Sequence, residues 1–380
     1  MRIDKEDLFQ WSLAHKDELL ELLKELAAIP APSHQEQKRV AFIKNWLKQQ
    51  GAEEVYVDEA LNVVLPFGCD GKNNITVYMA HTDVVFPDLD VLPVYEAEGK
   101  LFAPGVGDDT ANVVALMLCV KYLLNKGCQP KEPVLIVFNS CEEGLGNLKG
   151  VRQIMADYSG RIRELVSFDC LYNEIFVRAV GSERWKVSAS TCGGHSYSAF
   201  GNPNAIAYLA ELVTKLYRQE LPQVEGAKVT YNVGAISGGT SVNTIAQNAE
   251  MLYEYRSDDA DCLAFMRKQF MELVSAAQCP EASFEMACIG ERPCGSDVPE
   301  AAHEKLICRS IEAITAATGN CPIRRSASTD ANIPLSMGVP AVTFGLYMGD
   351  KMHTREEYVE IDSLETGLRI GLLMITSHFD

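Results

Sequence analysis

One apolar segment constrains the fold of this chain more than any other. Residues Ile75 to Ala80 form a largely apolar run that ends on His81, and a carboxylate follows two residues later at Asp83. Strands of this kind are typical of parallel sheets covered on both faces by helices. In such sheets ligands gather beyond the carboxyl ends of the strands. His81 is therefore a candidate metal ligand, and Asp83 is the carboxylate that would fix its ring.

The segments that follow predict a βαβ arrangement. A helix is predicted at about 111–125, and a second apolar strand follows at 133–140. Further strands are predicted at 165–168 and 174–180. Strands joined by helices in this order indicate a largely parallel sheet.

Acidic and imidazole side chains recur where these elements begin or end. They are Asp108 in a Gly-rich turn, the pair Glu142 and Glu143, Asp169 and, after the last predicted strand, His353. Each alone has an ordinary explanation, such as a helix cap or a surface acid. Counting only Glu143 of the glutamate pair, they and His81 give two His and three carboxylates at one end of the sheet, which suit a pair of zinc or similar divalent ions. Because adjacent residues leaving a strand point apart, one glutamate would bind metal and the other would take a proton.

Helical periodicity predicts the remaining elements of this first domain. A single helix is predicted over Asp7 to Ala27, and Ser33 is expected to cap a second helix that runs to Gln50. After an inserted segment the domain resumes with a helix at 300–318, a strand at 341–346 and a closing helix at 363–378.

The inserted segment has a different pattern, with strands that alternate apolar and polar residues from about Gly181. Its predicted order is βαββαβ, a ferredoxin-like unit. We therefore expect an α/β chain in which residues 1–183 and 290–380 form a catalytic domain with a mostly parallel sheet. Residues 184–289 would form an inserted lid or dimerisation domain.

Composition excludes several classes of partner. The chain has 34 basic and 52 acidic residues and a net charge of −18, so neither nucleic acid nor an anionic membrane is an expected partner. No apolar run approaches the ~20 residues of a membrane span. The twelve cysteines include no CxxC pair, and scattered reduced thiols favour a cytoplasmic location.

As an ordered set, four motifs resemble those of a known family. They are Met79–Asp83, Gly105–Asp109, Cys141–Gly144 and His353–Tyr358. The resemblance is to the dinuclear zinc metallopeptidase family (metallopeptidase family 20) that includes aminoacylase, carboxypeptidase G, peptidase T, dipeptidases and succinyl-diaminopimelate desuccinylase. It covers essentially the whole chain, and it implies the family's zinc-exopeptidase fold.

The resemblance implies a role for each candidate residue. The implied ligands are His81, Asp108 and Asp169 for one Zn²⁺, and Asp108, Glu143 and His353 for the other. Asp83 would orient His81, and Glu142 would be the general base for a zinc-bridging water. Mn²⁺ or Co²⁺ would be expected to substitute in vitro.

The inserted segment resembles the family as well. His195, in a Gly-flanked loop, would stabilise the tetrahedral intermediate, while Asn243 and Arg256 would bind substrate, Arg256 through a carboxylate. Two positions depart from the family pattern. Thr110 stands where many members have Lys, and Tyr197 where Gly is frequent.

These observations predict a metal-dependent hydrolase of a peptide or peptide-like amide bond, of the exopeptidase type that acts on di- or tripeptides. An N-acyl-amino-acid deacylase with the same site is the alternative. A scaffold that lost its activity is disfavoured because the base is retained. A thiol hydrolase using Cys141 is disfavoured because two neighbouring carboxylates raise a thiol pKa.

A single βαββαβ unit leaves a sheet edge exposed, so a homodimer through this unit is expected, with His195 reaching the partner's site.

Overall fold

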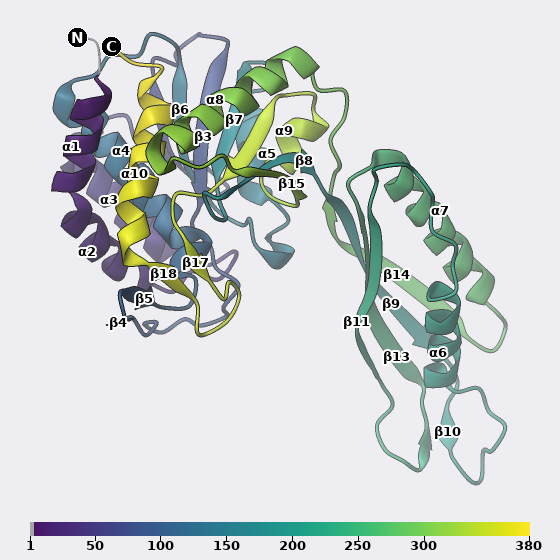
Figure 1. Ribbon diagram of the computed structural model, residues 1–380. Coiled ribbons are helices and arrows are strands. Elements are labelled where there is room, and N and C mark those ends of the chain that lie inside the picture. The colour runs from purple at the N-terminus through teal and green to yellow at the C-terminus, as the bar shows by residue number, and fades with distance from the viewer. Residues whose placement is uncertain (1–3) are drawn as a thin grey trace. The chain divides into compact units, whose positions relative to one another are not determined.

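The computed structural model describes residues 4–380, which form two compact units (Figure 1). The larger unit combines the residues up to Ala179 with Ser296–Asp380. The smaller unit is Val180–Gly295, and the predicted insertion 184–289 lies inside it. Because two separate chain segments build the larger unit, the smaller one is inserted in the sequence.

An eight-stranded sheet forms the centre of the larger unit, in the order β1-β2-β6-β3-β7-β16-β8-β15. Its strands are β1 (Tyr56–Val57), β2 (Val63–Phe67), β3 (Ile75–His81), β6 (Val134–Asn139), β7 (Ile162–Phe168), β8 (Glu174–Ala179), β15 (Ile323–Ala327) and β16 (Ala341–Phe344). The four central strands β6, β3, β7 and β16 are mutually parallel. This confirms the predicted α/β class with a large parallel sheet.

Helices cover both faces of this sheet, which explains why β3 is buried along its whole length. One face packs against α1 (Lys5–Ala14), α2 (Lys16–Ala27), α3 (Gln37–Gln49), α4 (Asn112–Lys126), α8 (Glu300–Thr318) and α10 (Ile361–Thr376). The other packs against α5 (Lys149–Asp157) and α9 (Asn332–Ser336). Along β3, Tyr78 belongs to the first core and Val77 and Met79 to the second, as the two-residue period of a strand requires.

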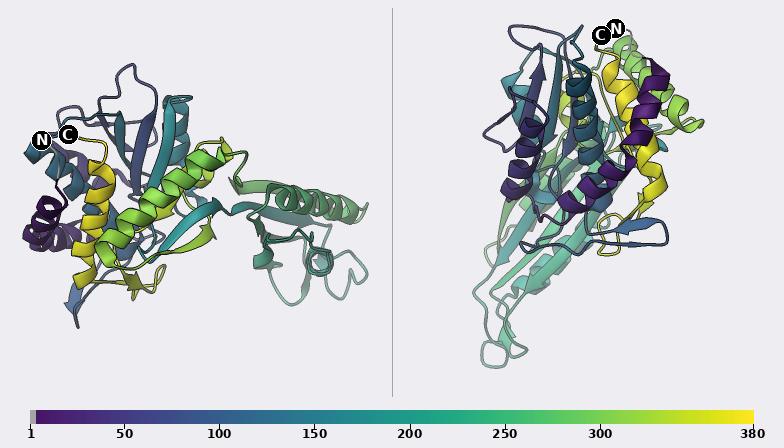
Figure 2. Two further views of the ribbon diagram at one scale, coloured as in Figure 1. Left: turned by 45° about the horizontal axis from the view of Figure 1, so that its top comes forward. Right: turned by 90° about the vertical axis from the view of Figure 1, so that its left-hand side faces the viewer.

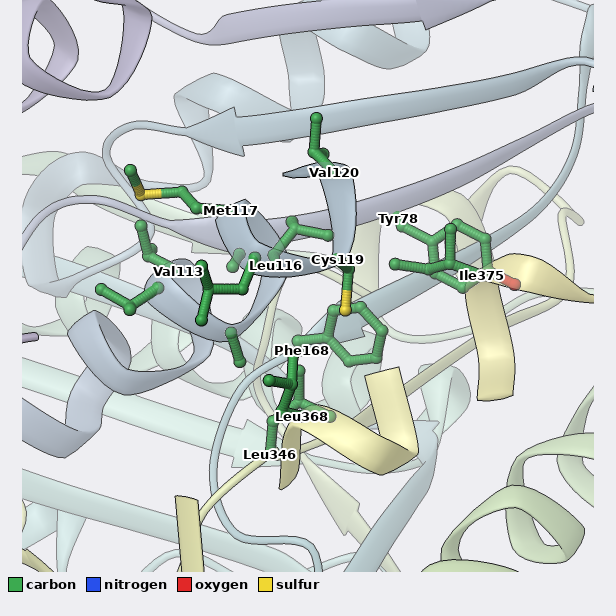
Figure 3. Close-up of a cluster of buried hydrophobic side chains, with 14 of the residues drawn as sticks. Tyr78, Val113, Leu116, Met117, Cys119, Val120, Phe168, Leu346, Leu368 and Ile375 are labelled. Carbon is green, nitrogen blue, oxygen red and sulfur yellow. The ribbon is translucent and has the colours of Figure 1, made fainter. Parts of the chain in front are cut away.

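The core around α4 shows how the helices are held (Figure 3). Leu116 and Cys119 of α4 lie in one buried cluster with Phe168 of the sheet and with Leu368 and Ile375 of α10. The helices α10 and α4 run alongside each other (Figures 1 and 2). Each fully buried side chain of this size contributes roughly 1.5–3 kcal/mol, so the carboxyl-terminal helix is a structural part of the first domain.

The predicted single helix over 7–27 is wrong, because the structure divides it at His15. His15 has φ −111° and ψ 11°, outside helical geometry. Its ring stacks on Trp11 with 3.9 Å between centroids, and its Nδ1 lies 2.8 Å from the Trp11 carbonyl oxygen. The predicted cap at Ser33 is also wrong, since α3 begins at Gln37.

A second, small sheet was not predicted. It has the order β17-β18-β5-β4, with strands β4 (Tyr95–Ala97), β5 (Lys100–Phe102), β17 (Gly349–Asp350) and β18 (Tyr358–Glu360). It joins the segment before α4 to the segment before α10. These two segments carry Asp108 and His353, so the sheet brings them together.

The smaller unit has an antiparallel sheet in the order β11-β13-β9-β14, packed against two helices. Its elements are β9 (Gly181–Ser190), β10 (Gly194–His195), α6 (Ala205–Leu216), β11 (Val229–Gly238), β12 (Thr244–Ile245), β13 (Asn248–Ser257), α7 (Ala260–Ala277) and β14 (Ser283–Arg292). Both β11 and β14 are edge strands. Across residues 4–380, helices that combine the length and the apolarity needed to span a membrane are not found.

Candidate metal centre and catalytic site

Three neighbouring parallel strands end at the same edge of the large sheet, and each delivers a candidate residue there. His81 is the last residue of β3, and Asp169 directly follows β7. Glu142 and Glu143 follow β6 after a two-residue turn. Because β6, β3 and β7 are adjacent and parallel, the arrangement places these side chains beside one another.

Asp108 reaches this edge from the turn that precedes α4. The turn begins at Gly105, whose φ of 71° is left-handed and where an added Cβ would lie 2.3 Å from Val84 Cγ1. Only glycine fits both conditions. The peptide bond between Asp108 and Asp109 is cis. The Gly-rich motif is therefore required for the path that carries Asp108 into the site.

The Asp108 carboxylate lies between two imidazoles. Its Oδ1 lies 3.1 Å from Nε2 of His81, and its Oδ2 lies 3.0 Å from Nε2 of His353. The same His353 nitrogen lies 3.2 Å from Oε1 of Glu143. Each Asp108 oxygen thus faces a different histidine, which is the arrangement of a carboxylate able to bridge two cations.

The candidate ligands fall into two groups that share Asp108. One group is His81, Asp108, Asp109 and Asp169, and the other is Asp108, Glu143 and His353. Within each group one possible ligand atom per residue lies within 4.8 Å of the others. Asp109 was not among the predicted ligands. In the structure its Oδ2 accepts the backbone N–H of His81 at 2.8 Å.

Asp83 is the centre of a buried hydrogen-bond network. Nδ1 of His81 lies 3.1 Å from the Asp83 carbonyl oxygen and 3.5 Å from Asp83 Oδ1. The Asp83 carboxylate accepts the backbone N–H groups of Glu142 and Glu143 at 3.0 and 2.9 Å. Ser33 donates to its Oδ2 at 2.7 Å, which is the role this serine has instead of capping a helix. Asp83 therefore ties the His81 strand end to the turn that carries both glutamates.

The two glutamates do not point apart as the strand pattern predicted. One carboxylate oxygen of each, and a ring nitrogen of His81, lie within 4.8 Å of one another. The cause is the backbone just before them, where Cys141 has a φ of 60°. The chain has left extended geometry at that point, so the alternation of a strand no longer applies.

The electrostatics of the cluster are those of an acidic site that needs positive charge. Burial and the charge of Asp108 raise the pKa of Glu143 to about 8 and that of Asp169 to about 7. Burial would also raise the pKa of Asp108, but hydrogen bonds from His353 and His81 hold it well below its usual range. Hydrogen bonds to Asp108 and Glu143 raise the pKa of His353 to about 11. All these carboxylates can be ionised together only if enough positive charge lies beside them. The two histidines supply part of that charge, and the rest has to come from bound cations.

The spacing of the donor atoms fits bound divalent ions. Two ligands about 2.0–2.1 Å from a tetrahedral ion lie roughly 3.3 Å apart. The contacts between His81 and Asp108, and from His353 to Asp108 and Glu143, are 3.0 to 3.2 Å. Nitrogen and oxygen donors without thiolates are the set expected for zinc or a similar ion. The residues present therefore fit a pair of divalent ions.

In the smaller unit the structure brings two predicted residues together. His195 pairs with Thr244 between the short strands β10 and β12, and the Ser196 N–H donates to the Asn243 carbonyl at 2.9 Å. Nδ1 of His195 accepts the backbone N–H groups of Tyr197 and Ser198 at 3.3 and 3.4 Å. Since Nδ1 is the acceptor, Nε2 carries the proton of the neutral ring. This exposed imidazole therefore presents a hydrogen-bond donor.

Arg256 lies at the opposite end of the same sheet. It pairs with Ser182 near the start of β9, whereas His195 follows Ser190 at the end of that strand. From position 182 to 190 an antiparallel strand rises about 27 Å. The Arg256 guanidinium contacts Glu254 through Nε at 3.1 Å and Nη2 at 3.0 Å. Within one smaller unit, Arg256 and His195 are therefore well separated.

Several buried residues that position the site were missed from the sequence. Glu36 accepts the Cys141 N–H at 3.1 Å, and the buried Arg39 donates to the Thr82 carbonyl and the Thr110 hydroxyl at 3.2 and 3.0 Å. Asn139 donates to the buried Asp330 at 2.6 Å. These residues carry no local signal, because their partners lie elsewhere in the chain.

A comparison with protein families gives one match. The family model described as Peptidase family M20/M25/M40 matches residues 77–377. This range contains all the predicted ligands, the glutamate pair and the predicted residues of the smaller unit.

Individual relatives are distant. A Peptidase M20 domain-containing protein of Schizosaccharomyces pombe is 26% identical over 244 residues, which cover 62% of this chain and 59% of that protein. The succinyl-diaminopimelate desuccinylase of Corynebacterium glutamicum is 24% identical over 354 residues, 90% of this chain and 92% of the relative. Among solved structures, the di-peptidase Dug1p of Saccharomyces cerevisiae superposes with a TM-score of 0.77 at 15% identity, and 100% of this chain and 99% of that one are covered. At this identity the structural likeness concerns the fold.

Proposed function

Because this chain belongs to Peptidase family M20/M25/M40, we propose that it is a metal-dependent hydrolase of a peptide or peptide-like amide bond in di- or tripeptide-sized substrates. One observation carries the proposal. The Asp108 carboxylate faces Nε2 of His81 with one oxygen and Nε2 of His353 with the other, beside the turn that presents Glu142 and Glu143.

His81, Asp108 and Asp169 would hold one divalent ion, and Asp108, Glu143 and His353 the other. We propose zinc, with Mn²⁺ or Co²⁺ able to substitute in vitro. Ions bound there would lower the pKa of a water molecule and polarise the substrate carbonyl. Asp83 keeps His81 in place by facing its Nδ1, so Nε2 points to the metal position.

The remaining chemistry belongs to side chains of the chain. Glu142 would take the proton of the attacking water and deliver it to the leaving amine. Its place is fixed by the hydrogen bond from its backbone N–H to Asp83. The Nε2–H of His195 would donate to the oxyanion of the tetrahedral intermediate. Asn243 and Arg256 would bind the substrate, Arg256 through a carboxylate.

The first prediction tests the activity and its metal dependence together. We expect purified protein to hydrolyse di- or tripeptides with a free amino terminus, to lose this activity after treatment with a chelator, and to regain it on addition of Zn²⁺. Release of free amino acids is the measurement. Peptide hydrolysis that persists after the chelator has removed all metal would contradict the proposal.

An N-acyl-amino-acid deacylase is the second candidate, favoured by the likeness to a succinyl-diaminopimelate desuccinylase. The same site can perform both reactions, because both cleave an amide. Acetylated and succinylated amino acids in the same assay separate the two. Faster hydrolysis of these compounds than of every free peptide would assign the chain to the second class. A protein that binds metal but cleaves neither group would be a scaffold.

We further propose that the smaller unit is a ferredoxin-like lid through which two cytoplasmic chains form a dimer. An extended tripeptide is at most about 11 Å long, so one bound substrate does not span the distance between His195 and Arg256 of one unit. We assign Arg256 to the site of its own chain and His195, with Asn243, to the site of the partner.

Complementation tests this arrangement. Variants Glu142→Gln and His195→Ala, each nearly inactive, are unfolded and refolded together in equal amounts. If His195 acts in the partner's site, each mixed dimer has one site with both groups intact, and activity returns to about a quarter of the wild-type level at random pairing. If His195 acts in its own chain, every site still lacks one group. A mixture as inactive as its parents would therefore exclude the assignment.

A further inference from the structure

Glu357 is a buried carboxylate outside the predicted ligand set. It is 1% exposed, although its neighbour Glu356 is exposed. Its Oε1 accepts the backbone N–H groups of Gly107 and Asp108, both at 2.8 Å. Its Oε2 accepts the N–H of Gly105 at 3.0 Å. Both carboxylate oxygens are thus used to hold the turn that carries Asp108.

This contact joins two parts of the site that are far apart in sequence. Glu357 lies four residues after His353, in the segment between β17 and β18. The β5 and β18 strands pair, with Tyr358 opposite Phe102, so the segment runs beside the approach to the Gly105 turn. Glu357 therefore fixes the backbone of Asp108 from the same segment that carries His353.

The turn needs such a contact because its glycines allow many backbone conformations. Gly105 and Gly107 restrict the backbone less than other residues do. Without an acceptor, three buried N–H groups would be left unsatisfied, which is unfavourable in a buried turn. Charged acceptors form stronger hydrogen bonds than neutral ones. A carboxylate is thus well suited to hold this turn in one conformation.

We propose that Glu357 is a positioning residue that preorganises Asp108 and His353 as one unit for metal binding. The inference rests on the proposed function, since it assumes that these two residues are ligands. Its consequence is that Glu357 sets the affinity for metal without touching the ions. Partners of this kind, one contact away from a ligand, typically change metal affinity by about 10–100-fold when they are replaced.

The test compares Glu357→Gln with the matched control Glu356→Gln, which removes the same charge one residue away. Apoproteins are titrated with Zn²⁺ against a chromophoric chelator, and Co²⁺ is added in parallel to record the visible absorption of the bound ion. We expect Glu357→Gln to weaken metal binding by about 10–100-fold and to change the cobalt spectrum. Glu356→Gln should match the wild type in both measurements.

The outcomes separate this inference from the proposed function. If the wild type binds no metal, the proposed function is wrong, and the inference is wrong with it. If the wild type binds metal and Glu357→Gln binds it equally well with an unchanged spectrum, the inference alone is wrong. A purely structural role predicts a lower melting temperature with unchanged metal affinity in the folded fraction.

A second measurement applies if Glu357→Gln does not fold. Amide hydrogen exchange of the wild-type apoprotein, followed on peptides covering 105–108, reports whether the turn is held before metal binds. We expect slow exchange in the apoprotein and little further protection when Zn²⁺ is added. Fast exchange that becomes slow only with Zn²⁺ would show that the metal, and not Glu357, orders the turn.

Discussion

Replacing Glu142 by Gln is expected to lower kcat for peptide hydrolysis by about 10²–10⁴-fold, the usual contribution of a general base. Metal content should stay at the wild-type value. The amide keeps the size of the side chain and loses only the proton acceptor. The hydrogen bond from the Glu142 backbone N–H to the Asp83 carboxylate is retained, so the turn keeps its conformation. Steady-state kinetics and metal analysis of the same preparation are the two measurements.

The matched control is Glu143→Gln, one residue further along the same turn. Glu143 lies 3.2 Å from His353 through Oε1, so this variant should lose metal as well as activity. Zinc lost from Glu142→Gln and retained in Glu143→Gln would show that the two roles are reversed. This outcome is a real alternative in the geometry, because oxygens of both glutamates lie near His81.

The parts of the site that could be predicted are those at strand ends. The apolar runs located β3, β6 and β7. The helices that connect these strands indicate that they run parallel. His81, Glu143 and Asp169 then had to meet at one edge of the sheet. The family resemblance read from the ordered motifs is confirmed by the family match. Local pattern was sufficient here because each residue is positioned by its own strand.

The parts that could not be predicted depend on contacts between distant segments. Glu357 accepts hydrogen bonds from residues about 250 positions earlier, and no periodicity marks such a partner. The small sheet that joins these segments has strands of two or three residues, too short for an alternating pattern. The direction of Glu142 was missed for a local reason, since the left-handed φ of Cys141 is rare outside glycine.

Replacing Asp108 by Ala is expected to remove more metal than any other single ligand change. The reason is electrostatic. Two divalent ions about 3.5 Å apart repel each other by on the order of 20 kcal/mol at an effective dielectric constant of 20. A carboxylate between them attracts both ions at once and offsets this repulsion. Without it, the second ion would be bound by fewer ligands against the field of the first.

Metal analysis of a series of alanine variants distinguishes this role from that of an ordinary ligand. Asp169→Ala and Glu143→Ala each remove a ligand of one proposed ion, so each should retain close to one ion per chain under conditions in which the wild type holds two. Asp108→Ala should retain close to none. Its two oxygens face different imidazoles, at 3.1 and 3.0 Å, so its loss removes a ligand from both proposed ions at once. Full metal occupancy in Asp108→Ala would rule out the bridging role, and loss of one ion alone would make Asp108 a ligand of a single site.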